Sequence, residues 1–459
     1  MKPYTTKALY RIAALLLLLI RTFTADRAFA RVGGAGGHGG GGFGHGGGGY
    51  GYGGGGSPLL IIIIIIIVVV YVVYSRQKGA VDGNGDATAD EQQPASQSFP
   101  EALDPQKVAG SFIAIQNAWQ QQDLGNVRKW LSDGMYQRLS KQLKMMGVLG
   151  QRNILSNVHI HQITTSSTTI DGQYQTADMA ISFTMDDSFV SSKYPEFNEQ
   201  YQGDTDIEYW TFIKRTDSVS EKNLYDNNNC PNCGAPFEVK MGEISRCSNC
   251  NTLTNSAAFD WVLSEITQQN EYRGPARISE DASLKELMKN DPFFAVQRME
   301  DIASNIFMQI MDVITGNDKK RLTRFADEPT TDAIAKQMQS TRPFVFDRLY
   351  LNNVILGRYS VEGDVVKLYF NLTATYRRVS VAGKLQMLDN DFVTWPFSME
   401  LSRNKNVLDK ASKAETVYSY ECSTCGAPYT DTTEDHCTYC DAPVVDIHRN
   451  WVLTGFTWG

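Results

Sequence analysis

The eight cysteines of this chain form four CxxC pairs, and the pairs fall into two sets of four thiols. The first set is Cys230, Cys233, Cys247 and Cys250, and the second set is Cys422, Cys425, Cys437 and Cys440. A CxxC turn directs two thiolates at one ion, and a second turn supplies the other two corners of a Zn–S4 tetrahedron. Because four thiolates leave no open coordination position, we predict two structural zinc ions rather than catalytic ones.

The residues around the cysteines fit small zinc ribbons. Gly234 and Gly426 each follow the second cysteine of a pair and permit the tight turn that exposes backbone amides to the sulfurs. Between the two pairs lie 13 residues in the first set and 11 in the second, which is enough for a short hairpin. We therefore predict ribbons at residues 228–252 and 420–442. Disulfide bonds and a redox-active CxxC are the alternatives, and both depend on the compartment.

The first hundred residues predict a membrane anchor. Residues 1–30 have the pattern of a secretory signal peptide, with a basic start, an apolar core and the small-residue site Ala28-Phe29-Ala30. Residues 31–58 are rich in glycine and predict a flexible segment, whereas residues 76–100 predict a polar linker. Between them, residues 59–75 predict a transmembrane helix.

The predicted span is short but carries no charge. Its residues from 59 to 74 are all Leu, Ile, Val or Tyr, and as a helix they would reach about 24 Å, against a hydrocarbon core of about 30 Å. Local thinning of the bilayer closes that gap. A buried strand is the alternative for the run of isoleucines. Arg76 and Lys78 follow directly, so the positive-inside rule places the large C-terminal region in the cytoplasm. Thiols stay reduced there, which favours zinc over disulfides.

The rest of the chain contains a long repeat. The first cysteines of the two sets are 192 residues apart, and the Trp-Val-Leu sequence at Trp451 follows that at Trp261 by 190. The Asp-Pro sequence at Asp291 likewise follows that at Asp104 by 187. We therefore predict two related domains, at residues 101–270 and 291–459, joined by a linker at residues 271–290.

Each predicted domain has a helical part followed by strands. In the first domain, apolar residues recur at helical spacing over residues 108–143, and alternation then predicts strands at 154–164 and 174–184 around an Asp171-Gly172 turn. Two more strands are predicted at 209–214 and 259–266. In the second domain, the same patterns predict helices over 293–339 and strands at 346–358, 365–379, 392–401 and 448–456. Helices on one face of a curved antiparallel sheet make an α+β domain, with each ribbon placed before the last strand.

Residues 104–160 resemble the start of a bacterial Tim44-like domain. The matching residues are Asp104, Pro105, Phe112, Ile115, Gln116, Ala118, Trp119, Asp123, Leu124, Leu131, Ser132, Asp133, Met135, Tyr136, Arg152, Asn153, Ile154 and Val158. The resemblance implies a cone-shaped fold like that of nuclear transport factor two, with a pocket between helices and sheet, and a role in binding membranes or partner proteins. The second domain is similar only in outline because it lacks the Ala-Trp pair. Zinc ribbons are not part of the family pattern.

Other residues that could do chemistry have structural interpretations. His159 and His161 alternate with apolar residues on one strand, which predicts a solvated strand face, and His436 adjoins a site that four cysteines already complete. Six tryptophans are spaced as core residues: Trp119, Trp130, Trp210, Trp261, Trp395 and Trp451. The GxSxG, HExxH and phosphate-loop patterns are absent from the sequence.

The balance of charge argues against a nucleic-acid partner. The chain has 43 Lys and Arg against 51 Asp and Glu, and no basic patch surrounds the cysteines, whereas a phosphate backbone requires one. We therefore predict a membrane-anchored scaffold that is not an enzyme and that binds protein partners or lipid on the cytoplasmic membrane face. Lipid and peptide are the candidate occupants of the pocket. The alternative is a cone-fold enzyme acting on a small apolar substrate.

Overall fold

The computed structural model describes most of the chain after residue 101. The described residues are 102–218, 223–237, 241–274, 282–291, 294–316, 318–339, 343–407, 422, 424–427, 435–445, 447 and 450–458. The predicted signal peptide, glycine-rich segment, transmembrane helix and first linker lie outside them. Across the described ranges, no helix combines the length and apolar character needed to cross a membrane.

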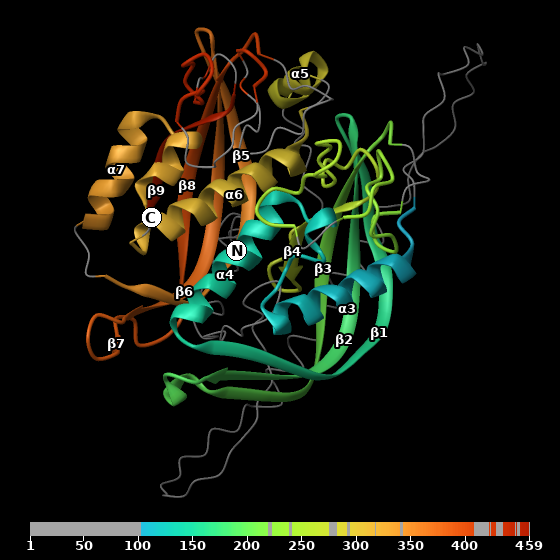
Figure 1. Ribbon diagram of the computed structural model, residues 1–459, viewed down its shortest axis with the longest axis vertical. Coiled ribbons are helices and arrows are strands. Elements are labelled where there is room, and N and C mark those ends of the chain that lie inside the picture. The colour runs from blue at the N-terminus through green and yellow to red at the C-terminus, as the bar shows by residue number, and fades with distance from the viewer. Residues whose placement is uncertain are drawn as a thin grey trace, which may run out of the picture. The chain divides into compact units, whose positions relative to one another are not determined.

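The first half, residues 102–274, packs helices against an antiparallel sheet (Figure 1). Its elements are α3 (Pro105–Gln121), η1 (Arg128–Trp130), α4 (Asp133–Val148), β1 (Gln151–Asp171), β2 (Tyr174–Ser191), η2 (Pro195–Phe197), β3 (Glu199–Arg215) and β4 (Val262–Gln268). The strand order in the sheet is β1-β2-β3-β4. Both long helices begin at capping side chains, because Asp104 accepts the amide of Gln106 and Ser132 accepts the amide of Met135.

The second half, residues 282–458, repeats the order of two long helices followed by four main strands, and adds a first helix and a short strand. These elements are α5 (Ala282–Asn290), α6 (Val296–Ile314), η3 (Lys319–Arg324), α7 (Glu328–Gln339), β5 (Val345–Glu362), β6 (Val365–Ser380), β7 (Gln386–Met387), β8 (Val393–Asn404) and β9 (Val452–Trp458). Its main strand order is β5-β6-β8-β9, and β7 pairs with β6. The mixed α/β architecture with two antiparallel sheets is the one that the sequence predicts.

One backbone connection recurs at the same place in both halves. Leu131, two residues before α4, forms a parallel bridge to Leu263 on β4, and Ala326, two residues before α7, forms the same bridge to Leu453 on β9. The following residue is hydrogen-bonded in the same way in both halves. The Ser132 amide donates to the Leu263 carbonyl at 2.9 Å, and the Asp327 amide donates to the Leu453 carbonyl at 3.1 Å. The second long helix of each half is therefore tied to the last strand of its own sheet.

The helices of the second half differ in position from the prediction. Helix α5 forms inside the stretch predicted as a linker, where it buries Leu284 and Leu287. The central helix α6 begins at Val296, with Ala295 at its N-cap, several residues after the Asp-Pro sequence expected to open it. Asp291 instead pairs with Arg403 at 2.7 Å, and both side chains are buried. A salt bridge to β8 thus fixes this aspartate in place of a helix-capping role.

Large aromatic rings fill the interior of the first half. The Phe112 ring on α3 lies 4.8 Å from Phe183 on β2 and 5.4 Å from Trp210 on β3, measured between centroids. Of the predicted core tryptophans, five are buried: Trp119, Trp130, Trp210, Trp261 and Trp451. The first four belong to the hydrophobic core of the first half, whereas Trp451 belongs to that of the second half.

The prediction for Trp395 was wrong, because 41 % of this side chain is exposed. It lies on β8 with the same alternation as Phe397, which is buried. The neighbouring strand β9 ends at Trp458, opposite Phe397, and does not extend as far as Trp395. Burial on a strand depends on where the adjacent strand ends, which the period of the strand itself does not reveal.

Candidate metal centres

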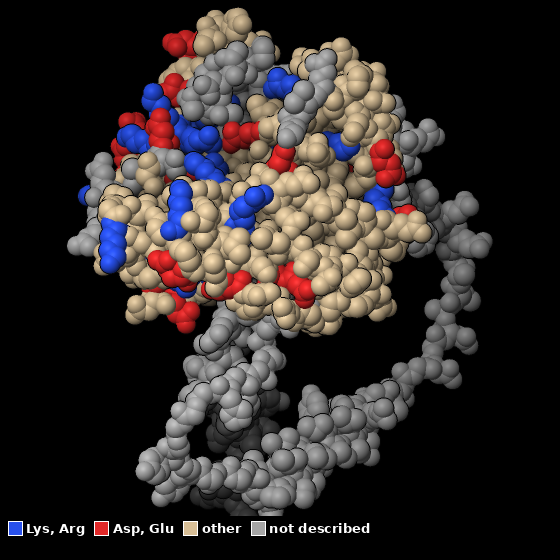
Figure 2. All heavy atoms as spheres, turned by 60° about the horizontal axis from the view of Figure 1, so that its bottom comes forward, with Lys and Arg blue, Asp and Glu red and all other residues tan. Residues whose placement is uncertain are grey.

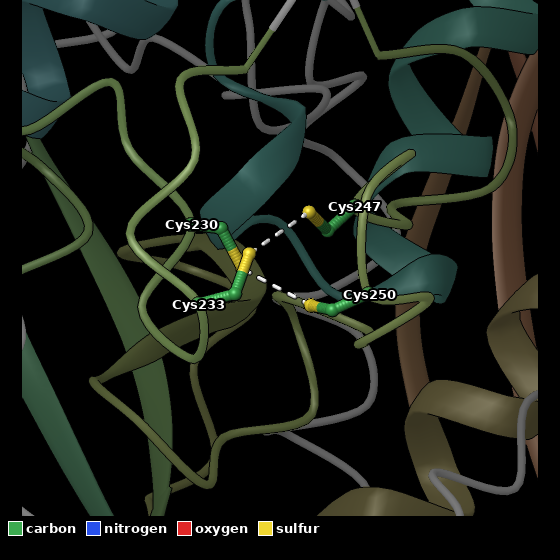
Figure 3. Close-up of side chains that lie close together, drawn as sticks. All are labelled: Cys230, Cys233, Cys247 and Cys250. Carbon is green, nitrogen blue, oxygen red and sulfur yellow. Dashed lines mark hydrogen bonds between the residues drawn. The ribbon is translucent and has the colours of Figure 1, made fainter.

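The first cysteine set converges in the segment that joins β3 to β4. The four Sγ atoms lie within 4.8 Å of one another. The Sγ atoms of Cys230 and Cys250 are 3.6 Å apart, and those of Cys233 and Cys247 are 3.8 Å apart (Figure 3). Figure 3 shows the two CxxC turns facing each other with all four sulfurs directed inward.

The second set has the same geometry in the segment between β8 and β9. The Sγ atoms of Cys422 and Cys440 are 3.6 Å apart, and those of Cys425 and Cys437 are 3.7 Å apart. This set also lies within 4.8 Å overall. Within the described part of the chain, these two sets are the groups of Cys, His, Asp or Glu side chains close enough to share a metal ion.

The separations between sulfurs fit a single ion and not disulfide bonds. With a Zn–S distance of about 2.3 Å, the edge of a ZnS4 tetrahedron is about 3.8 Å. The observed separations of 3.6–3.8 Å match that edge, whereas a disulfide needs about 2.05 Å. Each set therefore has the donor atoms and the spacing for one tetrahedral metal ion.

A left-handed residue follows the second cysteine of all four CxxC pairs. Gly234 and Gly426 have φ of 75°, Asn251 has φ of 58° and Asp441 has φ of 57°. The amide of each of these residues donates to the carbonyl of the first cysteine in its pair, at 2.8 to 2.9 Å. Only the two glycines were predicted from the sequence to form these turns. The asparagine and the aspartate were recognisable, because these two types adopt the left-handed region most readily among non-glycine residues.

Polar neighbours and burial shift the pKa values of the thiols in the first set in opposite directions. The Thr252 side chain, whose Oγ1 lies 3.2 Å from the Sγ of Cys250, lowers the pKa of that thiol to about 6. The Asn249 amide donates to the Cys233 Sγ at 3.4 Å and lowers the pKa of that thiol as well. Burial raises the pKa of Cys230 to about 12. A bound cation must displace the Cys230 proton, so metal affinity should fall as the pH falls.

The first set is anchored by two basic residues of η1. Arg128 is fully buried, and its guanidinium donates to the carbonyls of Gly242 at 3.1 Å and Glu243 at 2.8 Å while it pairs with Asp133. Lys129 donates to the Asn227 carbonyl at 2.8 Å. Burial lowers the pKa of this lysine. These contacts fix both sides of the ribbon on the start of α4.

Comparison with known proteins concerns the first half. Residues 95–223 match the family model of the Tim44-like domain. This match agrees with the resemblance noted from the sequence, and it runs from before α3 to just short of the first cysteine, Cys230. The cysteine set and β4 therefore follow the matched Tim44-like residues in the chain.

Other comparisons add little to the Tim44-like match. No curated protein matches the chain. A solved structure described as an "Ntf2 like protein involved in plasmid conjugation" is 7% identical, with 63% of this chain and 89% of that chain covered, at a TM-score of 0.12. So low a TM-score does not establish a common fold.

The three histidines among the described residues belong to neither four-thiol cluster. His159 and His161 are exposed on β1, as predicted, and the Nε2 of His161 lies 2.7 Å from the Thr184 hydroxyl. The ring of His436 lies 3.2 Å from the Asp435 carboxylate, and 55% of its side chain is exposed. The four thiols of the second set converge without it.

A hollow of about 580 Å³ lies on the sheet of the second half. Its lining includes Gly357, Gly455 and several polar side chains. The Arg358 guanidinium stacks 4.0 Å from the centroid of the Tyr369 ring, and Glu400 accepts from Thr454 at 2.8 Å. These pairs are side chains of neighbouring strands, and they do not form a nucleophile–base pair.

Charged side chains of both signs share the face drawn in Figure 2. Lys and Arg gather toward one side of this face, acidic side chains lie among them, and further acidic groups follow the lower edge. A basic surface broken by carboxylates is a weak match to a phosphate backbone, which favours continuous positive charge.

Proposed function

We propose that the chain is a membrane-anchored binding protein of the Tim44-like type, stabilised by two zinc ions and without enzymatic activity. The observation that carries the proposal is the combination of a Tim44-like match at residues 95–223 with two four-thiol clusters of tetrahedral spacing. In this proposal, the ligands are Cys230, Cys233, Cys247 and Cys250 for one ion and Cys422, Cys425, Cys437 and Cys440 for the other.

The chemistry of the clusters supports a structural role for the metal. A ZnS4 site is coordinatively saturated, so neither water nor substrate can enter the first shell of the ion. The interior of the Tim44-like half is occupied by aromatic rings, including fully buried Trp210. Both features favour a protein that binds through its surfaces over an enzyme with an internal active site.

The membrane part of the proposal comes from the sequence. Residues 59–75 would form the single span, and Arg76 and Lys78 would place both cysteine sets in the cytoplasm. The partners would then be proteins or lipid at the cytoplasmic membrane face. The reducing cytoplasm would keep the thiols available for zinc.

Native mass spectrometry of the detergent-purified full chain tests the zinc and lipid parts together. We expect two zinc ions per chain with all eight thiols reduced, and bound lipid or a partner protein in the same spectra. Fewer than two zinc ions with intact thiols would contradict the paired sites. Cell fractionation tests the anchor, because deletion of residues 59–75 should move the chain from the membrane to the soluble fraction. A reporter fused after Gly459 that is active only outside the cytoplasm would overturn the topology.

A further inference from the structure

Helix α4 contacts both the first cysteine ribbon and helix α6 of the second half. Asp133 and Gln137 face the ribbon, where they bond to Asn255 at 2.9 Å and to Glu243 at 2.9 Å. Gly134 and Lys141 face α6. At about 100° per residue, these four positions fall within about 100° around the helix axis, so the ribbon and α6 contact adjacent parts of one face of α4.

The packing of α4 on α6 is close and mostly polar. The Ser132 hydroxyl donates to the Asp301 carboxylate at 2.6 Å, and the buried Lys141 pairs with Asp312 at 3.0 Å. At Gly134, an added Cβ would lie 2.4 Å from the Asp301 carbonyl oxygen, so the two backbones approach closely only because this residue is glycine. We call this set of contacts the α4–α6 interface.

Glu243 connects the ribbon to both sides of this interface. This residue lies in the ribbon, four positions before Cys247. Its carboxylate accepts from Gln137 on α4 at 2.9 Å and pairs with Arg321 on η3 of the second half at 3.3 Å. Arg321 in turn bonds to Gln309 on α6 at 3.4 Å. One ribbon side chain thus links the two helices that form the interface.

Glu243 is held by Arg128, which donates to its carbonyl at 2.8 Å, and it lies on the strand that leads into the second CxxC turn. The ribbon strand that carries it is closed by the Ser245 hydroxyl, 2.6 Å from the Thr254 hydroxyl, and by the amide of Thr254, which donates to the Ser245 carbonyl at 3.0 Å. These bonds flank Cys247 and Cys250. A metal ion would join the turn of Cys247 and Cys250 to the turn of Cys230 and Cys233. Lys129 on η1 holds the latter turn, because it donates to the carbonyl of Asn227, three residues before Cys230.

The second ribbon is tied to its own half. In its described residues, the amide of Asn404 on β8 donates to the Ile447 carbonyl at 2.7 Å, and the Asn450 side chain donates to the Val444 carbonyl at 3.1 Å. Cys422, Cys437 and Val444 pack together as a small cluster of their own. The two cysteine sets are therefore alike in geometry and different in what they touch.

We infer that metal binding at the first cysteine set holds the α4–α6 interface closed, whereas metal binding at the second set does not. The inference rests on the zinc occupancy proposed above. Without the ion, the two CxxC turns lose their cross-link. The strand that carries Glu243 then loses its support on the cysteine side while the Arg128 bonds remain, and the contact with Arg321 weakens. The first ribbon is then a metal-dependent control of how firmly the two halves are joined.

Hydrogen exchange on the full chain in detergent tests this inference, with a matched pair of variants. One variant carries Cys230→Ser and Cys233→Ser, and the other carries Cys422→Ser and Cys425→Ser. We expect each to retain one zinc ion. Loss of the first ion should speed amide exchange in α4 and α6 by about tenfold while β6 and β8 exchange at wild-type rates. Loss of the second ion should leave α4 and α6 at wild-type rates.

A third variant, Glu243→Ala, separates the contact from the metal. It should keep two zinc ions and still exchange faster than wild type in α4 and α6. Three results would overturn the inference: unchanged rates in both helices after loss of the first ion, equal acceleration by both double variants, or uniform acceleration along the whole chain. A wild-type chain without zinc would contradict the proposed function instead, so the two failures are distinguishable.

Discussion

Arg348 on β5 forms a two-bond ion pair with Glu199 on β3, with nitrogen–oxygen distances of 2.6 and 2.9 Å. This pair joins the second sheet to the first. Arg348 has a left-handed backbone with φ of 59°, at a bulge where the register of β5 shifts, and its guanidinium lies 4.4 Å from the centroid of the Phe392 ring. Burial alone would raise the pKa of Glu199, but the hydrogen bonds and charge of Arg348 outweigh burial and lower the pKa of this carboxyl.

Replacing Arg348 with Ala should lower the free energy of unfolding by roughly 3 kcal/mol, because it leaves a partly buried carboxylate without its partner. Arg348→Lys should recover only part of this loss, since an ammonium cannot make the paired bonds. Urea unfolding followed by circular dichroism measures both. Arg358→Ala is the matched control, because Arg358 is exposed on the same strand and its loss should cost about 0.5 kcal/mol or less. Equal costs at both positions would contradict the role of the ion pair.

The left-handed residues of the CxxC turns should control metal retention. Asn251→Val places a β-branched residue at φ of 58°, a strain of about 1–2 kcal/mol, and should weaken zinc binding at the first set by roughly tenfold. Asn251→Gly keeps the turn and should bind zinc as the wild type does. Competition with a chromogenic chelator measures the affinities. Wild-type retention by Asn251→Val would show that the turn geometry is not required.

Two tryptophans should differ sharply in their contribution to stability. Trp210 is fully buried and its indole N–H donates to Glu208 at 2.9 Å, whereas 41 % of Trp395 is exposed. We expect Trp210→Ala to cost about 3–5 kcal/mol and Trp395→Ala about 0.5 kcal/mol or less, in the same urea assay. A large loss from Trp395→Ala in the isolated chain would mean that this side chain is covered.

The stability of the chain should depend on pH through Asp301. Burial raises the pKa of this carboxyl to about 7, although the Ser132 hydroxyl partly opposes the shift. The folded chain therefore binds a proton that the unfolded chain releases. The contribution of this proton to the free energy of unfolding is fully present below the unfolded pKa of about 4. It is lost as the pH rises toward 7, by up to about 1.4 kcal/mol per pH unit.

Asp301→Asn should flatten this slope, because the amide stays neutral at every pH. Unfolding curves for both chains from about pH 5 to about pH 8 give the comparison, with zinc content measured at each point because thiol ligands protonate at low pH. Parallel curves for the wild type and the variant would show that Asp301 does not titrate in this range.

Sequence patterns predicted the elements whose causes are local. The ligand candidates of the first set lie within a stretch of 21 residues, so their spacing alone shows which thiols approach one another. The turn at Asp171-Gly172 and the alternation of β2 are local as well. The exact spans were longer in the structure, since β1 and β2 both extend beyond the residues with clear alternation.

Contacts between the two halves were not predictable in the same way. Glu243 and Arg321 are 78 positions apart, and Glu199 and Arg348 are 149 apart. No periodic pattern in the sequence marks such pairs, because each depends on how two completed elements pack. The exposure of Trp395 was missed for a related reason, since it depends on the end of β9, a strand that begins far later in the chain.

The placement of each cysteine set before the last strand affects the order of folding. From β3 to β4 the chain passes through 46 intervening residues, and from β8 to β9 through 47. A strand that pairs across so long a connection must overcome the entropy of closing it. A metal ion that ties the middle of that connection together shortens the free chain on either side. Zinc uptake should therefore precede the pairing of β4 and β9, and metal-starved chains should accumulate with sheets that lack their final strand.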